Sequence, residues 1–252
     1  MSRIERALRR AVRRMRYDPA MKFQVVGERC SGTNFAHHLI RANVTNNPCQ
    51  AYGWKHGFPL FIAAPRDVVF VVMFREALPW LKSMYQKPWH STEALRALAF
   101  SDFIRAEWDA TIDKPGWFAL EEDDKRAGLP LQYDRNPLDG SRFANILEMR
   151  GMKMRAMLGL KTRGAKVVFR THAELTQNPE ALIEELAGTF GLSRKPGFTV
   201  PEGHFGWVWN ERKAWLGPGP IEISDADMAF IDSQIDPALE RAAGLDWPPQ
   251  AG

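Results

Sequence analysis

The chain has 252 residues, of which 45% are hydrophobic and 25% are charged, values typical of a globular domain with a substantial core. No apolar run approaches the roughly 18 residues needed to span a bilayer, and the basic N-terminus lacks the apolar stretch of a signal peptide. Cys30 and Cys49 are too few for a disulfide scaffold and lack metal-ligand spacing. We therefore expect a cytoplasmic protein.

The net charge of +4 is unevenly distributed. Residues 1–16 hold seven Arg and one Glu, a charge of +6 that leaves −2 for the rest of the chain. Apolar residues recur there at helical spacing, which predicts a basic amphipathic helix within residues 1–20. Such a helix can bind anionic lipid or nucleic acid, or dock on the body with its Arg side in solvent. We favour docking, with a weak membrane contact as the alternative, and expect no nucleic-acid partner.

A small-residue loop, Gly27-Glu-Arg-Cys-Ser-Gly-Thr-Asn34, lies between an apolar run and an amphipathic helix. A strand, a loop and a helix N-terminus form an anion site, because unpaired N–H groups and the helix dipole point at the loop. Gly27 and Gly32 have the spacing of a Walker-type phosphate loop. However, Thr33 and Asn34 stand where a nucleoside triphosphatase needs Lys and a Mg²⁺-binding hydroxyl. The loop is thus predicted to bind phosphate without metal-dependent phosphoryl transfer.

Two further β-branched runs, 67–74 and 165–169, have the composition of strands buried on both faces of a parallel sheet. Helical patterns cover residues 91–110, 141–160 and 178–190, a helix or turn covers 77–86, and a last helix starts at Ser224. Residues 113–140, rich in Pro, Gly and acids, are predicted to form a long loop of the kind that often binds substrate. This order predicts an α/β fold with a mainly parallel central sheet flanked by helices, as one domain over residues 21–252.

Ligands of such sheets bind beyond the C-terminal ends of the strands. The loop 27–34 and the residues after Phe74 and Phe169 should therefore share one edge. Arg75 follows the second strand directly, and Ser83 comes eight residues later. A guanidinium and a hydroxyl suit a phosphate. Taken alone, Arg75 is more readily explained by a strand-end salt bridge.

Together these motifs resemble the P-loop sulfotransferases, which use 3′-phosphoadenosine-5′-phosphosulfate (PAPS). Residues 27–34 match the family loop Gly-x-Pro-Lys/Arg-Ser-Gly-Thr-Thr, and Arg75 with Ser83 matches its 3′-phosphate pair. Residues 169–192 resemble its strand, Asn/Asp-Pro and Phe-Gly-Leu unit, and 212–217 resembles the loop that closes over the 3′-phosphate. The resemblance covers most of residues 23–217 in pieces, and it implies a P-loop nucleoside-triphosphate-hydrolase-like architecture.

The resemblance also implies a donor site that holds PAPS without a metal. The residues expected to bind the donor are Arg29, Cys30, Ser31, Gly32, Thr33 and Asn34 at the 5′ end and Arg75, Ser83, Arg212 and Lys213 at the 3′-phosphate. Cys30 stands where the family carries Lys or Arg, so the cation that stabilises the leaving group must come from elsewhere. We assign that role to Lys55 and the catalytic base to His56. An equally weighted alternative is that residues 54–59 form a turn in which His56 only hydrogen-bonds to the backbone.

Several alternatives stay open at this point. Cys30 could be a low-pKa nucleophile at a helix N-terminus, although no partner base is evident. Arg150 and Lys153 are expected on a solvated helix face, where they could also bind an anionic acceptor. The acceptor is a hydroxyl or amine of a small molecule or glycan, a saccharide among them, and the oligomeric state is open. A P-loop kinase or nucleotidase and a non-catalytic nucleotide-binding protein of the same fold are the competing functions.

Overall fold

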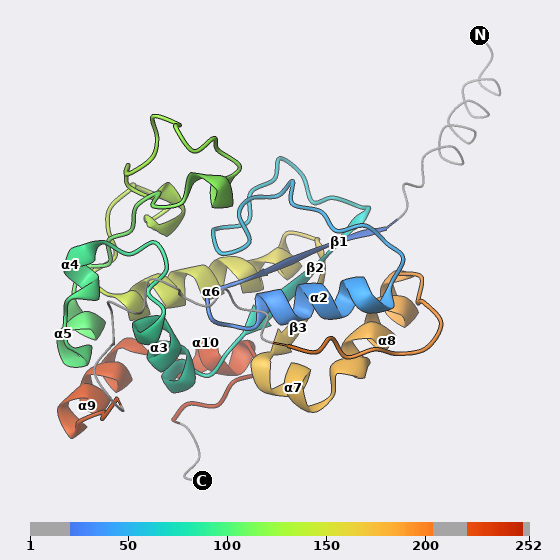
Figure 1. Cartoon of the computed structure of the whole chain (residues 1–252). Helices are drawn as coiled ribbons and strands as arrows, with labels where there is room; N and C mark the ends of the chain where they lie inside the picture. Colours follow the sequence, from blue (N-terminus) through green and yellow to red (C-terminus); the bar gives the residue numbers. More distant parts are fainter. Residues whose placement is uncertain (1–20, 204–220, 249–252) are drawn as a thin grey trace, which may run out of the picture.

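The structure is a computed structural model that describes residues 21–203 and 221–248. Its centre is a parallel sheet of three strands in the order β1–β2–β3, formed by Lys22–Gly27, Val68–Phe74 and Lys166–Thr171 (Figure 1). All three predicted strands are confirmed, as is the prediction of an α/β fold with a parallel sheet flanked by helices. The sheet is small, and β1, which leads into the 27–34 loop, is an edge strand among the described residues.

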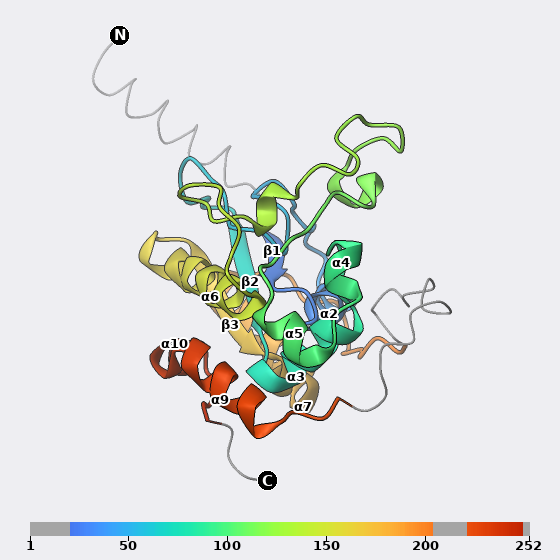
Figure 2. The same cartoon turned by 90° about the vertical axis from the view of Figure 1, so that its left-hand side faces the viewer.

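Helices cover both faces of the sheet, so every residue of β2 is buried. Val69 and Val71 face α2 (Thr33–Asn43) and α8 (Pro179–Phe190) in one apolar core. The alternate residues, Phe70 and Val72 among them, face α6 (Ile146–Thr162) and α10 (Pro237–Ala242) in a second core. Figure 2 shows α6 and α2 on opposite sides of the strands. This two-sided burial explains the β-branched run without polar alternation.

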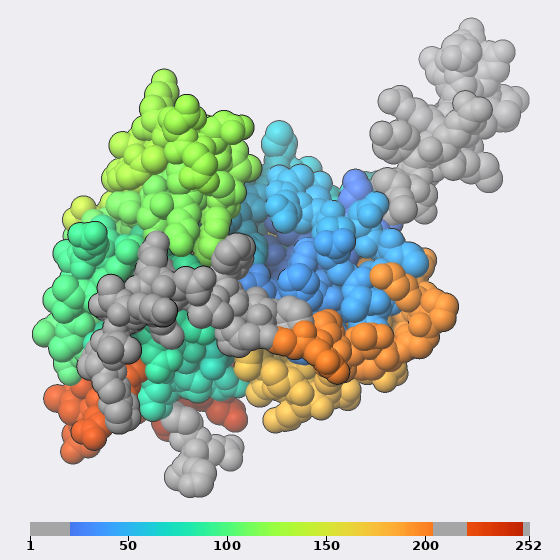
Figure 3. Space-filling model, in the orientation of Figure 1, coloured from blue at the N-terminus to red at the C-terminus, as the bar shows by residue number. Residues whose placement is uncertain are grey.

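A third core lies past the C-terminal end of the sheet. It joins α3 (Ala77–Gln86), α5 (Phe100–Arg105), the start of α6 and α9 (Asp225–Gln234). Residues 113–140 cross this region as a long loop with two short 3₁₀ turns, Pro115–Phe118 and Gln132–Asp134. This confirms the predicted loop, which rises from the body beside residues 50–65 in Figure 3.

Helix ends follow the predicted signals in most places. Asn178 accepts a hydrogen bond from the Ala181 amide at the start of α8, and Gly191 ends that helix with a φ of 71°. Ser224 begins α9 with a capping box. The predicted 77–86 helix is confirmed as α3.

Two predicted helices differ in extent, and two further helices were not predicted. Residues 91–110 form two short helices, α4 (Glu93–Arg96) and α5, because Ala99 is extended between them. α6 begins at Ile146 instead of residue 141, since Asn145 is its cap. A helix α7 (His172–Gln177) replaces the predicted loop after β3, started by a capping box at Thr171. The short α10 was not predicted.

No helix of the described residues is long and apolar enough to cross a membrane. The helix predicted within residues 1–20 and the Arg212–Lys213 segment both lie outside the described residues.

We predict that Leu39→Ala lowers the free energy of unfolding by about 2–5 kcal/mol, because Leu39 is 0% exposed in the core between α2 and the sheet. Leu138→Ala is the matched control, since Leu138 is 87% exposed and its change should fall within about 0.5 kcal/mol. Denaturant titration of both variants measures the difference. Equal losses would contradict the packing described for α2.

Candidate active site at the C-terminal edge of the sheet

The 27–34 loop begins at a glycine that no larger residue can replace without movement. A Cβ on Gly27 would lie 2.6 Å from the Met73 carbonyl oxygen of β2. Gly32, the residue directly before α2, has a φ of 91° and supplies no side-chain cap. The first turn of α2 contains no acidic residue. Gly32 thus provides no side-chain cap for α2, which suits an anion-binding helix end.

Side chains from the loop itself and from three other segments donate hydrogen bonds to the carbonyl groups of this loop. His56 Nδ1 donates to the Gly27 carbonyl at 2.7 Å, and Trp80 Nε1 donates to the Arg29 carbonyl at 2.8 Å. Arg75 Nη1 donates to the Cys30 carbonyl at 2.8 Å, while Ser31 Oγ donates to the Glu28 carbonyl. Four successive carbonyls thus bond to side chains, which fixes the backbone on which the α2 amides depend.

Arg75 and Ser83 lie together, as their spacing predicts. Arg75 Nη1 is 3.0 Å from Ser83 Oγ, and both side chains are half-buried at the C-terminal end of β2 and on α3. Because Arg75 also bonds the loop at Cys30, the guanidinium, the hydroxyl and the loop form one continuous polar surface. The Nε of Arg75 is buried without a hydrogen-bond partner among the described residues. The geometry allows one anion to contact both side chains.

The Lys55–His56 turn reaches the loop from the other side. Lys55 Nζ donates to Asn34 Oδ1 at 2.5 Å, and the Lys55 carbonyl accepts from the Gly27 amide at 2.9 Å. Burial lowers the pKa of Lys55. A cation therefore lies beside the first turn of α2, although residue 30 of the loop is Cys.

His56 is held as a neutral imidazole with a defined tautomer. Burial, and then the neighbouring Lys55, lower its pKa well below the ordinary value. Because Nδ1 donates to the Gly27 carbonyl, Nε2 is left as the ring's acceptor. A neutral ring with its acceptor nitrogen defined has the chemistry of a general base.

His172 closes the same edge, directly after β3. Its Cδ2 lies 2.9 Å from the position that a Cβ would take on Gly32, so the glycine allows the ring to pack on the loop. Burial and the charge of Arg75 lower the pKa of His172. The ends of all three strands therefore meet at the 27–34 loop, as expected for a parallel sheet.

Arg29 is the residue whose placement differs most from expectation. Its side chain is 2% exposed and points into the protein, where Nη2 donates to Asp134 Oδ2 at 2.7 Å and Nη1 donates to the Trp89 carbonyl. The guanidinium also lies over the rings of Trp54 and Trp108. A contact with donor sulfate would require this ion pair to break, so we assign Arg29 a positioning role.

Arg29 belongs to a buried ion cluster of Glu28, Arg29, Asp134 and Lys153. Lys153 Nζ donates to Asp134 Oδ1 at 2.6 Å and to the His56 carbonyl at 2.9 Å, and it lies 2.8 Å from Glu28 Oε1. Although burial alone would raise it, Arg29 and Lys153 hold the pKa of Asp134 well below its usual range. The cluster thus joins the loop, the 113–140 segment, α6 and the Lys55–His56 turn.

The expectation of a solvated face for Arg150 and Lys153 is wrong. They are 4% and 0% exposed, and Arg150 pairs with Glu240 while its Nη2 donates to the Arg75 carbonyl. Both residues therefore hydrogen-bond to the backbone of site segments from the protein interior. They are too buried to bind an anionic acceptor. Their partner acids lie outside α6, with Asp134 19 residues from Lys153 and Glu240 90 residues from Arg150.

Cys30 and Ser31 also take roles other than those expected of their side chains. Burial raises the pKa of the Cys30 thiol to about 11, which contradicts a low-pKa nucleophile. Ser31 is 1% exposed, and its hydroxyl is engaged with Glu28 inside the loop. Ser31 and the buried Thr33 can therefore offer the ligand their backbone only, whereas the Cys30 side chain is half-buried.

An aromatic cluster next to His56 was not predicted. Trp54 contacts the rings of His56, His90, Phe118 and Tyr133 at centroid distances of 5.0–5.7 Å. His90 in turn pairs with Asp113, its Nδ1 lying 2.5 Å from Oδ1. The only sequence signal was the density of aromatics at residues 54, 89 and 117–118.

No group of three or more His, Cys, Asp or Glu able to hold a metal ion occurs within residues 21–203 and 221–248. Comparison of the chain with protein-family models, curated proteins and solved structures found no match. The site is therefore interpreted from its own geometry.

We predict that Asp134→Asn destabilises the fold by about 3–5 kcal/mol, because it leaves Arg29 and Lys153 buried with Glu28 as their remaining carboxylate. Thermal or denaturant unfolding measures the loss. Asp124→Asn is the control, since its pair with Arg126 is at the surface and should change stability little. A loss no larger than that of the control would contradict the cluster.

We predict that acidification from pH 7.5 to 5.5 destabilises the protein through His56. Its folded pKa is lowered, so the unfolded state binds a proton below about pH 6.5 that the folded state refuses. The contribution of His56 to the free energy of unfolding is fully present above that pH, and it falls by about 1.4 kcal/mol between pH 7.5 and 5.5. His56→Gln should make the pH profile flatter by that amount, and an unchanged slope would contradict the burial of a neutral ring.

Proposed function

We propose that the protein is a sulfotransferase that moves a sulfuryl group from PAPS to a hydroxyl or amine acceptor. The observation that supports this most is the meeting of an uncapped α2 N-terminus, Lys55 at Asn34, and the bonded pair Arg75–Ser83 on one polar surface. The α2 N-terminus with Lys55 can bind one anionic group, and Arg75 with Ser83 can bind a second. A nucleotide with phosphates at its 5′ and 3′ positions has two such groups. The P-loop nucleoside-triphosphate-hydrolase-like architecture belongs to the same proposal.

The amides of Gly32, Thr33 and Asn34 bind the 5′-phosphosulfate in this scheme. Lys55 replaces the loop cation that the family carries at the position of Cys30, and it acts on the oxygen between phosphorus and sulfur. Arg75 and Ser83 bind the 3′-phosphate. No metal is needed, because the charge that develops in the transition state lies on the leaving nucleotide, within reach of a fixed cation and a helix end.

The transfer is a single in-line displacement. The acceptor oxygen or nitrogen forms a bond to sulfur while the bond from sulfur to the 5′-phosphate oxygen breaks, and 3′-phosphoadenosine-5′-phosphate (PAP) leaves. His56 Nε2, which the lowered pKa of the ring keeps unprotonated at neutral pH, takes the acceptor proton. Positioning of the acceptor and charge stabilisation supply the rate enhancement, without a covalent enzyme intermediate.

The acceptor is proposed to lie against Trp54, whose half-buried ring stands beside His56. Partly exposed indole and phenol rings favour the flat face of a sugar or an aryl group. A saccharide hydroxyl thus remains the proposed acceptor class.

We predict that PAP binds the purified protein without Mg²⁺, as measured by isothermal titration calorimetry. Arg75→Ala and Ser83→Ala should each weaken binding, by about 10-fold or more for the charged contact and by less for the hydroxyl. Arg126→Ala is the matched control, because this exposed arginine lies on the 113–140 segment and pairs with Asp124. Because Arg75 also bonds the loop, circular dichroism and a melting curve accompany its variant.

Titration with ATP and Mg²⁺ separates the competing functions. ATP binding that needs Mg²⁺, with none for PAP, would favour a kinase or nucleotidase. Tight PAP binding without sulfuryl transfer to any acceptor in a broad panel would favour a non-catalytic nucleotide-binding protein.

A further inference from the structure

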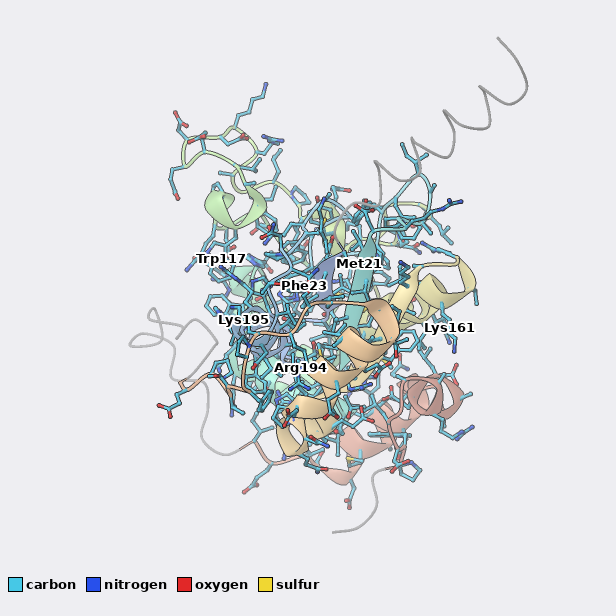
Figure 4. The ribbon with its side chains drawn as sticks, turned by 90° about the vertical axis from the view of Figure 1, so that its right-hand side faces the viewer. Met21, Phe23, Trp117, Lys161, Arg194 and Lys195 are labelled. Carbon is cyan, nitrogen blue, oxygen red and sulfur yellow. The ribbon has the colours of Figure 1, made fainter. Side chains whose placement is uncertain are left out.

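The end of the sheet opposite the candidate active site carries a concentration of exposed cations. We call it the basic face and define it by the half-buried Lys22 and the exposed side chains of Arg66, Lys161, Lys166, Arg194 and Lys195. Figure 4 looks onto this end of the molecule, with Met21, Lys161, Arg194 and Lys195 labelled. The chain beyond residue 16 has a net charge of −2, so this concentration is an asymmetry of the fold and not a property of its composition.

Hydrogen bonds join the segments of the basic face into one surface. Lys166 Nζ donates to the Arg66 carbonyl at 2.7 Å and contacts Met21 Sδ. Asn46 Nδ2 donates to the Met21 carbonyl, and its Oδ1 accepts from the Ser193 amide. The starts of the strands, the end of α2 and the segment after α8 therefore form a continuous end of the molecule. The acids Asp67 and Glu180 are paired there with Lys22 and Arg194, respectively.

Exposed aliphatic side chains occur on the segments that lead to Arg66 and that follow Lys195. Phe61 packs against Phe70 of the sheet and anchors the loop that precedes β2. Its neighbours Leu60 and Ile62 project outward, with exposures of 58% and 109%. Val200 is 45% exposed beside Asn43, at the end of α2. Large exposed aliphatics next to clustered cations are the composition of surfaces that enter the headgroup region of a membrane.

We propose that the basic face docks on an anionic lipid surface, with Leu60 and Ile62 entering the headgroup region. The seven Arg of residues 1–16 lie outside the described residues, so the face is defined without them. A nucleic acid would match the charge but not the exposed aliphatics, so lipid is the occupant that both features favour. The strands, of six or seven residues, hold the candidate active site roughly 20 Å from this surface.

The test is flotation of the full chain with vesicles of pure phosphatidylcholine and of phosphatidylcholine with 30% phosphatidylglycerol. We expect binding only to the anionic vesicles, and a decrease as salt rises. Because each cation near such a surface contributes about fivefold, the double change Arg66→Glu and Lys161→Glu should weaken partitioning by about 10-fold or more. Ile62→Ser should weaken it by about 3- to 10-fold.

Two controls carry the same chemical changes elsewhere. Lys82→Glu alters an exposed cation on α3, and Leu129→Ser alters a 51% exposed aliphatic on the 113–140 segment. Both should bind within twofold of the unchanged chain. The proposal is overturned if the chain fails to bind anionic vesicles, or if the face variants bind as the controls do. It is also overturned if duplex DNA of random sequence binds more tightly than the vesicles in the same buffer.

Discussion

The ion pair between Arg29 and Asp134 determines how the candidate site is built. A fully buried carboxylate is costly unless it is paired, and Asp134 accepts hydrogen bonds from Arg29, Lys153 and Trp108. The loop, α6 and the 113–140 segment can therefore satisfy their buried charges only when they are assembled together. The 27–34 loop is thus held in place by the buried ion cluster and by the side-chain hydrogen bonds to its carbonyl groups. Pre-organised donors of this kind act on an anion without rearrangement at the moment of reaction.

The same cluster explains a division of labour among the basic residues. Arg29 and Lys153 are committed to carboxylates in the interior, whereas Lys55 and Arg75 contact neutral oxygens at Asn34, Cys30 and Ser83. Lys and Arg each have further N–H donors beyond these bonds, so Lys55 and Arg75 can bind phosphate without releasing the loop. A cation bonded to a buried carboxylate is already neutralised, and turning it toward a ligand would leave the carboxylate unpaired. We therefore assign ligand binding to Lys55 and Arg75, and positioning to Arg29 and Lys153.

Local patterns predicted the parts of the fold that depend on local chemistry. The strand of β2, the α3 helix, the caps at Asn178 and Ser224 and the approach of Arg75 to Ser83 all follow from spacing and composition. The direction of the Arg29 side chain does not, because its partner lies 105 residues away. Whether a charge is buried depends on such distant pairing.

A signal for the buried lysine was nevertheless present. Arg150 and Lys153 fall between Ile146 and Met157 at steps of four and three residues, so they occupy the apolar stripe of α6 and not its polar face. Charged residues within an apolar stripe predict buried partners of opposite charge. The assignment of Arg150 and Lys153 to a solvated face overlooked this. The division of residues 91–110 into two helices could not be predicted, since no residue type near Ala99 indicates that the chain is extended there.

The central claim is that the 27–34 loop is a metal-free anion site held in place by the buried ion cluster. A crystal structure of the protein with PAP, grown in the presence of a metal chelator, tests it most directly. The account predicts the 5′-phosphate at the amides of Gly32–Asn34 beside Lys55, the 3′-phosphate on Arg75 and Ser83, and the Arg29–Asp134 pair intact. A nucleotide bound elsewhere, or Arg29 turned out of the cluster onto the ligand, would contradict it.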